Sequence, residues 1–348
     1  MYDEMDPVKM GRRQKIALLS LILLMSLVFS CAQTRQSVYR KNKPLMDTIV
    51  AITVVADSGQ NAEKAIEDAF STIERFGDLI NFFSDKSELS LINRNSGIRE
   101  VKVSPDTLGV IERAIYISEM SGGAFDPTIG PEIKMWDFFK KIRPSDSDIK
   151  KKLSLVNYRD IVIDRDKSTV FLRKKGMLMD LGGIAKGYAA DLALANLKRN
   201  GISSGIVAAA GEIRAFGLKP DGQPWNIGIK NPRQKNESDE IIARIKVSNK
   251  AISTSGDYER YFIEEGKRYH HILDPKTGYP ASQCRSVTVI NDKGIFADGF
   301  STAVFVSGPE KGMKLASEAG VDAVIIDSSG VLRTTPGLKG ILKIEEGH

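Results

Sequence analysis

Apolar residues in the first half of the chain follow two kinds of spacing. Residues 48–55 (TIVAITVV) are a β-branched run, which predicts a strand. Residues 61–80 carry apolar side chains at helical spacing, so we expect an amphipathic helix packed on the core. Residues 104–121 predict a second helix, because a capping serine stands directly before a proline. The polar segment 81–97 between them predicts a loop.

Short apolar stretches dominate from about residue 158 onwards. Helices are expected at 188–200, which Gly201 ends, and at 297–307, which carries small residues on one face. Residues 134–152 mix aromatic and charged side chains and predict a partial helix broken at Pro144. Strands or short apolar stretches are expected at 161–163, 169–172, 177–180, 205–210, 212–216, 225–229, 241–247, 287–290, 324–326 and 341–344. Strands with helices inserted between them predict an α+β fold.

The composition is that of an ordinary globular protein. The chain has 348 residues, of which 42% are hydrophobic and 27% charged, which suits one large domain or two smaller ones. Its net charge is +6, but the basic residues are scattered and form no stripe of the kind that a nucleic-acid backbone needs. We therefore expect no nucleic acid among its partners, while an anionic ligand or membrane surface stays open.

The start of the chain has the pattern of a targeting segment. Basic residues between positions 9 and 15 precede an apolar run, 16–29, which is shorter than the roughly 20 residues of a membrane span. This pattern predicts a signal peptide over residues 1–30. A small residue directly before Cys31 resembles the lipobox of bacterial lipoproteins, so we expect lipidated Cys31 and a polar tether over 31–44. A plain secretory signal or an uncleaved anchor is the alternative.

The stretch DLGGIAKGYAAD, at residues 180–191, has the character of a ligand-binding turn. It is not a phosphate-binding P-loop, because Lys186 precedes Gly187 and Tyr188 stands where that motif needs Ser or Thr. A strand that ends at Asp180, then glycines, then a helix start would still bring backbone amides and a lysine toward an anion. A tight turn without a ligand is the alternative.

The stretch ADGFSTA, at residues 297–303, is a candidate metal site. Asp298 and Thr302 are one helical turn apart, so they share one face of a helix. Their oxygen atoms suit Mg²⁺, which takes few protein ligands together with waters and substrate phosphates. Helix capping by Asp298, with Thr302 packed in the core, is the alternative.

Two turn-rich stretches complete the candidates. GGAFDPTIGP holds Asp126 in a stiff turn, where its carboxylate binds a ligand or caps the chain at Thr128. YHHILDPKTGYP contains His270 and His271, of which strand alternation sends one outward and one inward. No further histidine or cysteine pair lies at ligand spacing, so a zinc site is not expected.

Together these stretches resemble the ApbE family of FAD:protein FMN transferases. The motifs follow in the order MDT, FSDKSELSLIN, GGAFDPTIGP, DLGGIAKGYAAD, AAAGEIRAFG, WNIGIKNP, ISTSGDYERYF, HILDPKTGYP and ADGFSTAVFVSG. The resemblance implies a single large α+β domain over residues 45–348, T-fold-related, with mixed sheets and packed helices. The chain departs from the family's common glycines at Asp47 and at Ala210.

The resemblance also implies a reaction. FAD is cleaved at its diphosphate, FMN passes to a serine or threonine hydroxyl of an acceptor protein, and AMP leaves. The implied acceptors are subunits of membrane electron-transport complexes, such as sodium-pumping NADH:quinone reductase. With a lipidated Cys31, we expect the protein in the cell envelope, anchored on the periplasmic or extracytoplasmic side of a membrane.

By position, the resemblance assigns roles to single residues. The implied Mg²⁺ ligands are the backbone carbonyl of Gly183 and the side chains of Asp298 and Thr302, with Ser301 beside them. The implied contacts of FAD are Met46, Phe83, Ala124, Phe125, Asp126, Asp180, Lys186 and Ile272. His271 matches a histidine implicated in catalysis, and its near-neutral unperturbed pKa favours it as the base that activates the acceptor hydroxyl. Asp298 is the competing base, although metal ligation would weaken it.

Two other functions would use the same residues. Water in place of the acceptor hydroxyl would give an FAD pyrophosphatase that produces FMN and AMP. A non-enzymatic flavin-binding lipoprotein would hold FAD without releasing AMP. The release of AMP, and whether FMN ends free or bound to a protein, discriminates between the three functions.

Overall fold

A computed structural model describes residue 12, residues 36–233 and residues 240–345. The expected signal peptide and Cys31 fall outside these residues, apart from the single position 12. Within the described part of the chain, no helix is both long and apolar enough to span a membrane.

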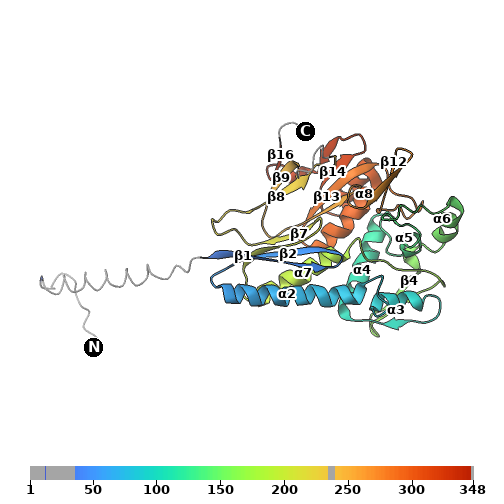
Figure 1. Ribbon diagram of the computed structural model, residues 1–348, viewed down its shortest axis with the longest axis horizontal. Coiled ribbons are helices and arrows are strands. Elements are labelled where there is room, and N and C mark those ends of the chain that lie inside the picture. The colour runs from blue at the N-terminus through green and yellow to red at the C-terminus, as the bar shows by residue number, and fades with distance from the viewer. Residues whose placement is uncertain (1–11, 13–35, 234–239, 346–348) are drawn as a thin grey trace, which may run out of the picture.

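An eight-stranded antiparallel sheet forms the centre of the molecule, with the strand order β1-β2-β6-β7-β10-β13-β14-β15 (Figure 1). Its strands are β1 (Ser37–Leu45), β2 (Thr48–Ala56), β6 (Ser204–Ala209), β7 (Glu212–Phe216), β10 (Ala251–Gly256), β13 (Cys284–Asn291), β14 (Asp322–Asp327) and β15 (Leu332–Thr334). The α+β class is confirmed, although every strand pair within the described sheets is antiparallel where mixed sheets were expected.

Three smaller sheets surround this centre. They are β3 (Val101–Lys102) with β5 (Thr169–Leu172) and β4 (Ile161–Asp164), β8 (Trp225–Lys230) with β9 (Ile241–Val247) and β16 (Leu342–Ile344), and the hairpin of β11 (Tyr261–Glu264) and β12 (Lys267–His270). The sheet of β8 and β9 covers one face of the central sheet, because Trp225 and Ile245 join a core cluster with Ile252 and Val324.

Helices cover the opposite face of the central sheet. The helices are α2 (Gly59–Ile80), α3 (Glu88–Arg94), α4 (Pro105–Met120), α5 (Gly130–Ile133), α6 (Asp146–Leu153), α7 (Ala185–Arg199) and α8 (Gly294–Glu318), with short 3-10 turns at Tyr158–Asp160 and Pro336–Leu338. Helices α2, α7 and α8 bury their apolar faces in the main core together with inward residues of β2, β6 and β13. Figure 1 shows α2 and α7 beneath the sheet and α8 above α4.

The main sequence predictions of helices are confirmed. Helix α4 begins after Ser104, whose hydroxyl accepts a hydrogen bond from the Thr107 amide, and a proline occupies its first turn. Helix α8 contains the predicted 297–307 segment and continues past a kink, where Gly308 has φ 78° and Pro309 follows.

Several local predictions are wrong. The tether expected at 31–44 is strand β1 from Ser37 onwards, paired with β2 along its whole length. The expected loop 81–97 contains α3. No strand forms at 177–180, where Leu178 makes only an isolated bridge to Ile129. Strand β1 forms because β2 pairs with it, which a local pattern does not show, whereas α3 begins at the capping residue Ser87 inside a polar segment.

The turn between β1 and β2 explains one departure from the family pattern. Met46 and Asp47 both have positive φ, 51° and 56°. This is the backbone of a two-residue hairpin turn, in which glycine is favoured and aspartate is tolerated. Asp47 therefore takes a position that suits glycine without breaking the hairpin.

Candidate functional site

The implied metal ligands meet where the start of α7 touches α8. Asp298 is buried, and its Oδ2 accepts a hydrogen bond of 2.9 Å from the Gly187 amide. A methyl group at Gly183 would lie 3.3 Å from Thr302 Oγ1 and 3.2 Å from the ring of Phe125. The structure thus brings the glycine turn, the carboxylate and the threonine hydroxyl to one place.

Hydroxyl groups from strand β10 surround this place. Ser301 is fully buried, donates to the Asp298 carbonyl over 2.8 Å and lies 2.8 Å from Ser255 Oγ. Ser255 Oγ is also 3.4 Å from Thr302 Oγ1, and Ser253 Oγ is 3.3 Å from that of Ser301. The Ser301 hydroxyl is therefore engaged by the protein. Ser253 and Ser255 were not predicted as site residues, although they alternate in the motif ISTSG.

Glu212 is a second buried carboxylate that the sequence analysis did not select. It begins β7, opposite Ser253 in the register with β10, and only 1% of it is exposed. Neither of its carboxylate oxygens has a hydrogen-bond partner. Burial, followed by the negative charge of Asp298, raises its pKa well above the ordinary value. In the sequence, Glu212 is the one acidic residue in a short apolar segment, and this could have marked it as a site residue.

The donor set at this place fits a hard cation. It consists of carboxylates, hydroxyls and a backbone carbonyl, which are the ligands of Mg²⁺. Burial raises the pKa of both Asp298 and Glu212, and the Glu212 oxygens have no hydrogen-bond partner, so a cation beside them would favour the ionised carboxylates. Within the described residues, no cluster of three or more His, Cys, Asp or Glu side chains forms a metal site.

Positive charge also lies at the glycine turn, where the charge of Lys186 reaches both Asp298 and Glu212. The Asp180 carboxylate accepts a hydrogen bond of 2.9 Å from the Gly182 amide, and the Lys186 ammonium donates to the Gly182 carbonyl over 3.3 Å. Burial raises the pKa of Asp180, and the charges of Lys186 and Arg260 oppose the rise. Arg260 is thus a neighbour of the site that the sequence analysis missed, because it comes from the distant segment before β11.

His271 lies directly after β12, and its amide donates to the Arg260 carbonyl over 3.1 Å. Its Nδ1 is buried without a hydrogen-bond partner. Burial, followed by the charges of His270, Arg260 and Lys186, lowers its pKa to about 3. The argument for this base from a near-neutral pKa is therefore wrong for this structure, in which the imidazole is neutral at pH 7.

His270 has a different place from its neighbour. It is 3% exposed, and its Nε2 lies 2.7 Å from the Ala281 carbonyl. Ile272 follows the pair and is buried, with its amide 3.3 Å from His270 Nδ1. His270 thus fixes the turn that presents His271.

The segment of Ala124, Phe125 and Asp126 lies against the glycine turn. Ala124 and Phe125 are buried, and Phe125 contacts Gly183 as described above. The Asp126 carboxylate accepts hydrogen bonds from the Thr128 amide (2.8 Å), the Thr128 hydroxyl (2.6 Å) and the Tyr158 amide (2.9 Å). Asp126 thus stabilises its own turn, as expected from the alternative in which it caps the chain at Thr128.

Met46 and Phe83 lie on other elements. Met46 packs on α2, where its Cγ is 3.2 Å from the place of a methyl group at Gly77. Phe83 is 77% exposed, with its ring edge-on to Phe82 at 5.2 Å. These two residues join the candidate site through the family resemblance alone.

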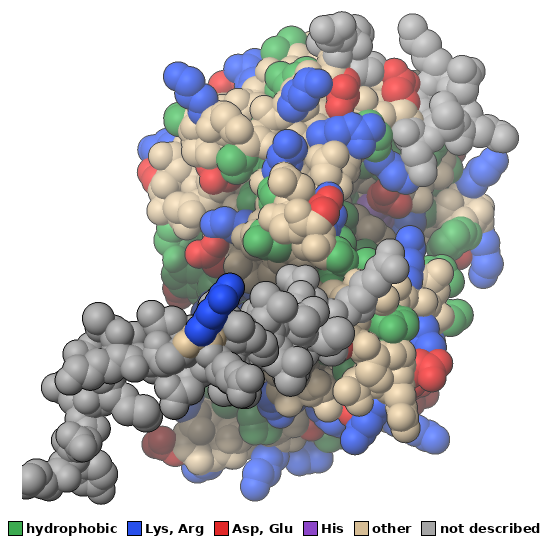
Figure 2. Space-filling model, turned by 90° about the vertical axis from the view of Figure 1, so that its left-hand side faces the viewer, with side chains coloured by type: hydrophobic (Ala, Val, Ile, Leu, Met, Phe, Trp, Pro, Cys, Tyr) green, Lys and Arg blue, Asp and Glu red, His purple; other side chains and the backbone are tan. Residues whose placement is uncertain are grey.

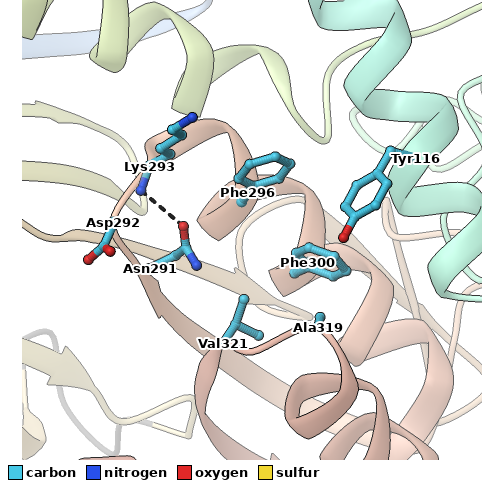
Figure 3. Close-up of a pocket in the computed structure, with 8 residues that line it drawn as sticks. All are labelled: Tyr116, Asn291, Asp292, Lys293, Phe296, Phe300, Ala319 and Val321. Carbon is cyan, nitrogen blue, oxygen red and sulfur yellow. Dashed lines mark hydrogen bonds between the residues drawn. The ribbon is translucent and has the colours of Figure 1, made fainter.

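A pocket of about 290 Å³ lies beside the start of α8 (Figure 3). Its lining residues are Tyr116, Asn291, Asp292, Lys293, Phe296, Phe300, Ala319 and Val321. None of the predicted site residues is among them. Figure 2 shows Lys and Arg side chains dispersed over the visible face, without a continuous stripe.

Comparison with known proteins decides the family. The family model described as "ApbE family" matches residues 46–325. The chain belongs to the ApbE family. The chain is 31% identical to an FAD:protein FMN transferase of Treponema pallidum, with 91% of this chain and 92% of that protein covered. It is also 31% identical to one of Vibrio cholerae, with 94% and 96% covered.

Solved structures of ApbE proteins share the fold. The ApbE protein of Thermotoga maritima superposes with a TM-score of 0.81 at 35% identity, covering 88% of this chain and 99% of that chain. The flavin transferase ApbE of Vibrio cholerae gives a TM-score of 0.79 at 29% identity, covering 88% and 99%.

Proposed function

We propose that this chain is an FAD:protein FMN transferase that requires Mg²⁺. It moves FMN from FAD to a serine or threonine hydroxyl of an acceptor protein and releases AMP. The observation that carries the proposal is the meeting of Gly183, Asp298 and Thr302 beside the buried Glu212, with the positive charge of Lys186 nearby. The names of the relatives supply the substrate class.

The reaction replaces one phosphorus–oxygen bond by another. The acceptor oxygen bonds to the phosphorus of the FMN half, the diphosphate bridge breaks, and AMP leaves with the bridging oxygen. A diphosphate repels a nucleophile, so neutralisation of its charge dominates the barrier. Bound Mg²⁺ supplies a Lewis acid for the phosphate oxygens.

The chain's own residues hold the reacting groups. Gly183, Asp298 and Thr302 would hold the cation, and Ser255 and Ser301 fix the rotamers of the side chains around it. Lys186 and Arg260 add positive charge for the diphosphate, and the glycine backbone permits its close approach.

His271 is the proposed acceptor of the hydroxyl proton. Its buried, unpartnered Nδ1 gives the site a ring nitrogen that no protein group uses. Burial is the main cause of its lowered pKa, followed by nearby positive charges, and an anionic diphosphate would offset the charges and favour the protonated imidazole. The basicity of His271 therefore rises when the substrate binds.

The proposed acceptors are subunits of membrane electron-transport complexes, and the proposed location is the cell envelope, with lipidated Cys31 as the membrane anchor. The apolar run before Cys31 and the family membership support this placement.

The test is a transfer assay with FAD, Mg²⁺ and a candidate acceptor domain. AMP release together with a fluorescent acceptor band on a denaturing gel would establish the transferase. AMP with only free FMN would establish the pyrophosphatase, and retained FAD without AMP would refute both.

Two substitutions sharpen the assay. Thr302→Val keeps the side-chain shape but removes the hydroxyl, and we expect AMP release to fall by about 100-fold or more. Ser307→Ala removes a hydroxyl from the same helix that only bonds to the Ala303 carbonyl, so it should leave the rate unchanged. Equal rates in the two variants would exclude the proposed role of Thr302.

A further inference from the structure

Neither α7 nor α8 caps its own N-terminus. Ile184 precedes α7 and Lys293 precedes α8, and neither makes a side-chain capping hydrogen bond. The first amides of a helix need acceptors from elsewhere when they are buried. The two helices therefore depend on other elements for this purpose.

Each helix receives its cap from an aspartate of the other. Asp298 of α8 accepts from the Gly187 amide in the first turn of α7, over 2.9 Å. Asp191 of α7 accepts from the Ile295 amide in the first turn of α8, over 3.0 Å. Gly187 and Asp191 are one turn apart on α7, and so are Ile295 and Asp298 on α8. The two hydrogen bonds therefore stabilise the same contact between α7 and α8.

Close backbone packing leaves this contact little freedom. A methyl group at Gly187 would lie 2.1 Å from the Gly294 carbonyl oxygen, and one at Gly294 would lie 2.4 Å from that of Gly187. A shift of α8 along α7 would therefore move Asp298 relative to the glycine turn that carries Gly183.

Arg214 of β7 fixes the second aspartate. Its Nε donates to Asp191 Oδ1 over 2.9 Å, and another guanidinium nitrogen donates to the Asp292 carbonyl over 2.8 Å. The side chains of Arg214 and Asp191 are only 10% and 20% exposed. Since β7 also begins with Glu212, this ion pair ties β7, α7 and the start of α8 into one unit.

We propose that Asp191, held by Arg214, is a positioning residue that sets the affinity of the cation site at Gly183, Asp298 and Thr302. The proposal rests on the Mg²⁺-dependent function above. Asp191 has no hydrogen bond to these three residues and acts through the packing of α8 on α7, while its charge also reaches the neighbouring Glu212. Replacing the groups that hold metal ligands in place typically changes metal affinity by about 10- to 100-fold.

The test compares Mg²⁺ binding by the full chain and by Asp191→Asn in the absence of FAD. Binding is measured by titration calorimetry and by the rise in melting temperature with Mg²⁺ concentration. We expect the dissociation constant for Mg²⁺ to rise about 10-fold or more in the variant. In the FAD assay, excess Mg²⁺ should restore the maximal rate, whereas the Mg²⁺ concentration for half-maximal rate stays raised.

A matched control separates positioning from stability. Asp327 on β14 is also buried, accepts from the Val331 amide and pairs with Arg333, but it lies outside the contact of α7 and α8. Asp327→Asn should lower the melting temperature without changing the affinity for Mg²⁺. If Asp191→Asn fails to fold, Arg214→Lys tests the same unit, because one ammonium cannot reproduce both guanidinium contacts.

The outcomes separate this proposal from the proposed function. An unchanged Mg²⁺ affinity in Asp191→Asn, or in Arg214→Lys where only that variant folds, would overturn the positioning role while the wild-type chain still binds Mg²⁺. A wild-type chain without any Mg²⁺ response would overturn the cation site itself, and the positioning role with it.

Discussion

Glu132 on α5 is a buried acid outside the candidate site, and its ionisation should destabilise the fold. The side chain is fully buried, and neither carboxylate oxygen has a hydrogen-bond partner. A methyl group at Gly278 would lie 2.9 Å from its Oε2, so the carboxylate faces the turn after His271. Burial raises the pKa of Glu132 from 4.5 to about 7, against the opposing charge of Lys152.

The sign and size of the effect follow from these two values. Between pH 4.5 and about 7 the folded chain keeps a proton that the unfolded chain releases. Glu132 therefore contributes stability that is full below pH 4.5 and is lost as the pH rises through 7. The difference between the two pKa values corresponds to at most about 3.4 kcal/mol, at 1.36 kcal/mol for each pKa unit.

The perturbation is Glu132→Gln, which keeps the shape of the side chain and cannot ionise. Relative to the wild type, the variant should gain about 2 to 3 kcal/mol of unfolding free energy between pH 5 and pH 8.5. The assay is urea unfolding followed by tryptophan fluorescence at several pH values. Glu119→Gln, at an exposed position of α4, is the control and should show a flat difference. A flat difference for Glu132→Gln as well would refute the burial argument.

Three other predictions concern the backbone and His271. Ala210 has φ 53°, which is a strained conformation for a residue with a side chain. Ala210→Gly should therefore raise the unfolding free energy by about 1 kcal/mol in a urea titration, and a lower unfolding free energy would contradict this strain. Gly187→Ala places a methyl group 2.1 Å from the Gly294 carbonyl oxygen. The variant should lose about 3 kcal/mol of unfolding free energy and most of its AMP release. A stable, active variant would contradict the close contact between α7 and α8. His271, with a pKa lowered from 6.5 to about 3, contributes stability above pH 6.5 that is lost as the pH falls toward 3. His271→Asn should flatten this slope in urea titrations between pH 4 and 7, and an unchanged slope would show that the imidazole is not buried as described.

The sequence predicts those elements whose burial is set by one continuous pattern. Helix α2 keeps helical spacing along its length, and β2 is a β-branched run, so both were predicted near their observed bounds. Strand β1 carries polar residues at an edge and forms because β2 offers it a pairing partner. A local pattern does not contain that partner, which is why a tether was predicted there.

The same distinction separates the predicted and missed site residues. Asp298 and Thr302 lie one turn apart on one helix, so their spacing was visible in the sequence. Glu212, Arg260 and Asp191 reach their places through strand register and helix packing. The ordinary pKa of His271 was a poor guide for the same reason, because burial and neighbouring charges set its value.

Two kinds of charged side chain meet at the glycine turn. Asp298 and Glu212 are buried carboxylates that repel each other, and a cation would relieve this repulsion. Lys186 and Arg260 lie near the neutral His271 and oppose its protonation, and the charge of Lys186 also reaches Asp298 and Glu212. A bound cation would lower the repulsion between the two carboxylates, and an anionic diphosphate would offset the positive charges around His271. The chain therefore gains most from binding the pair, and the glycines of the turn allow both to approach its backbone.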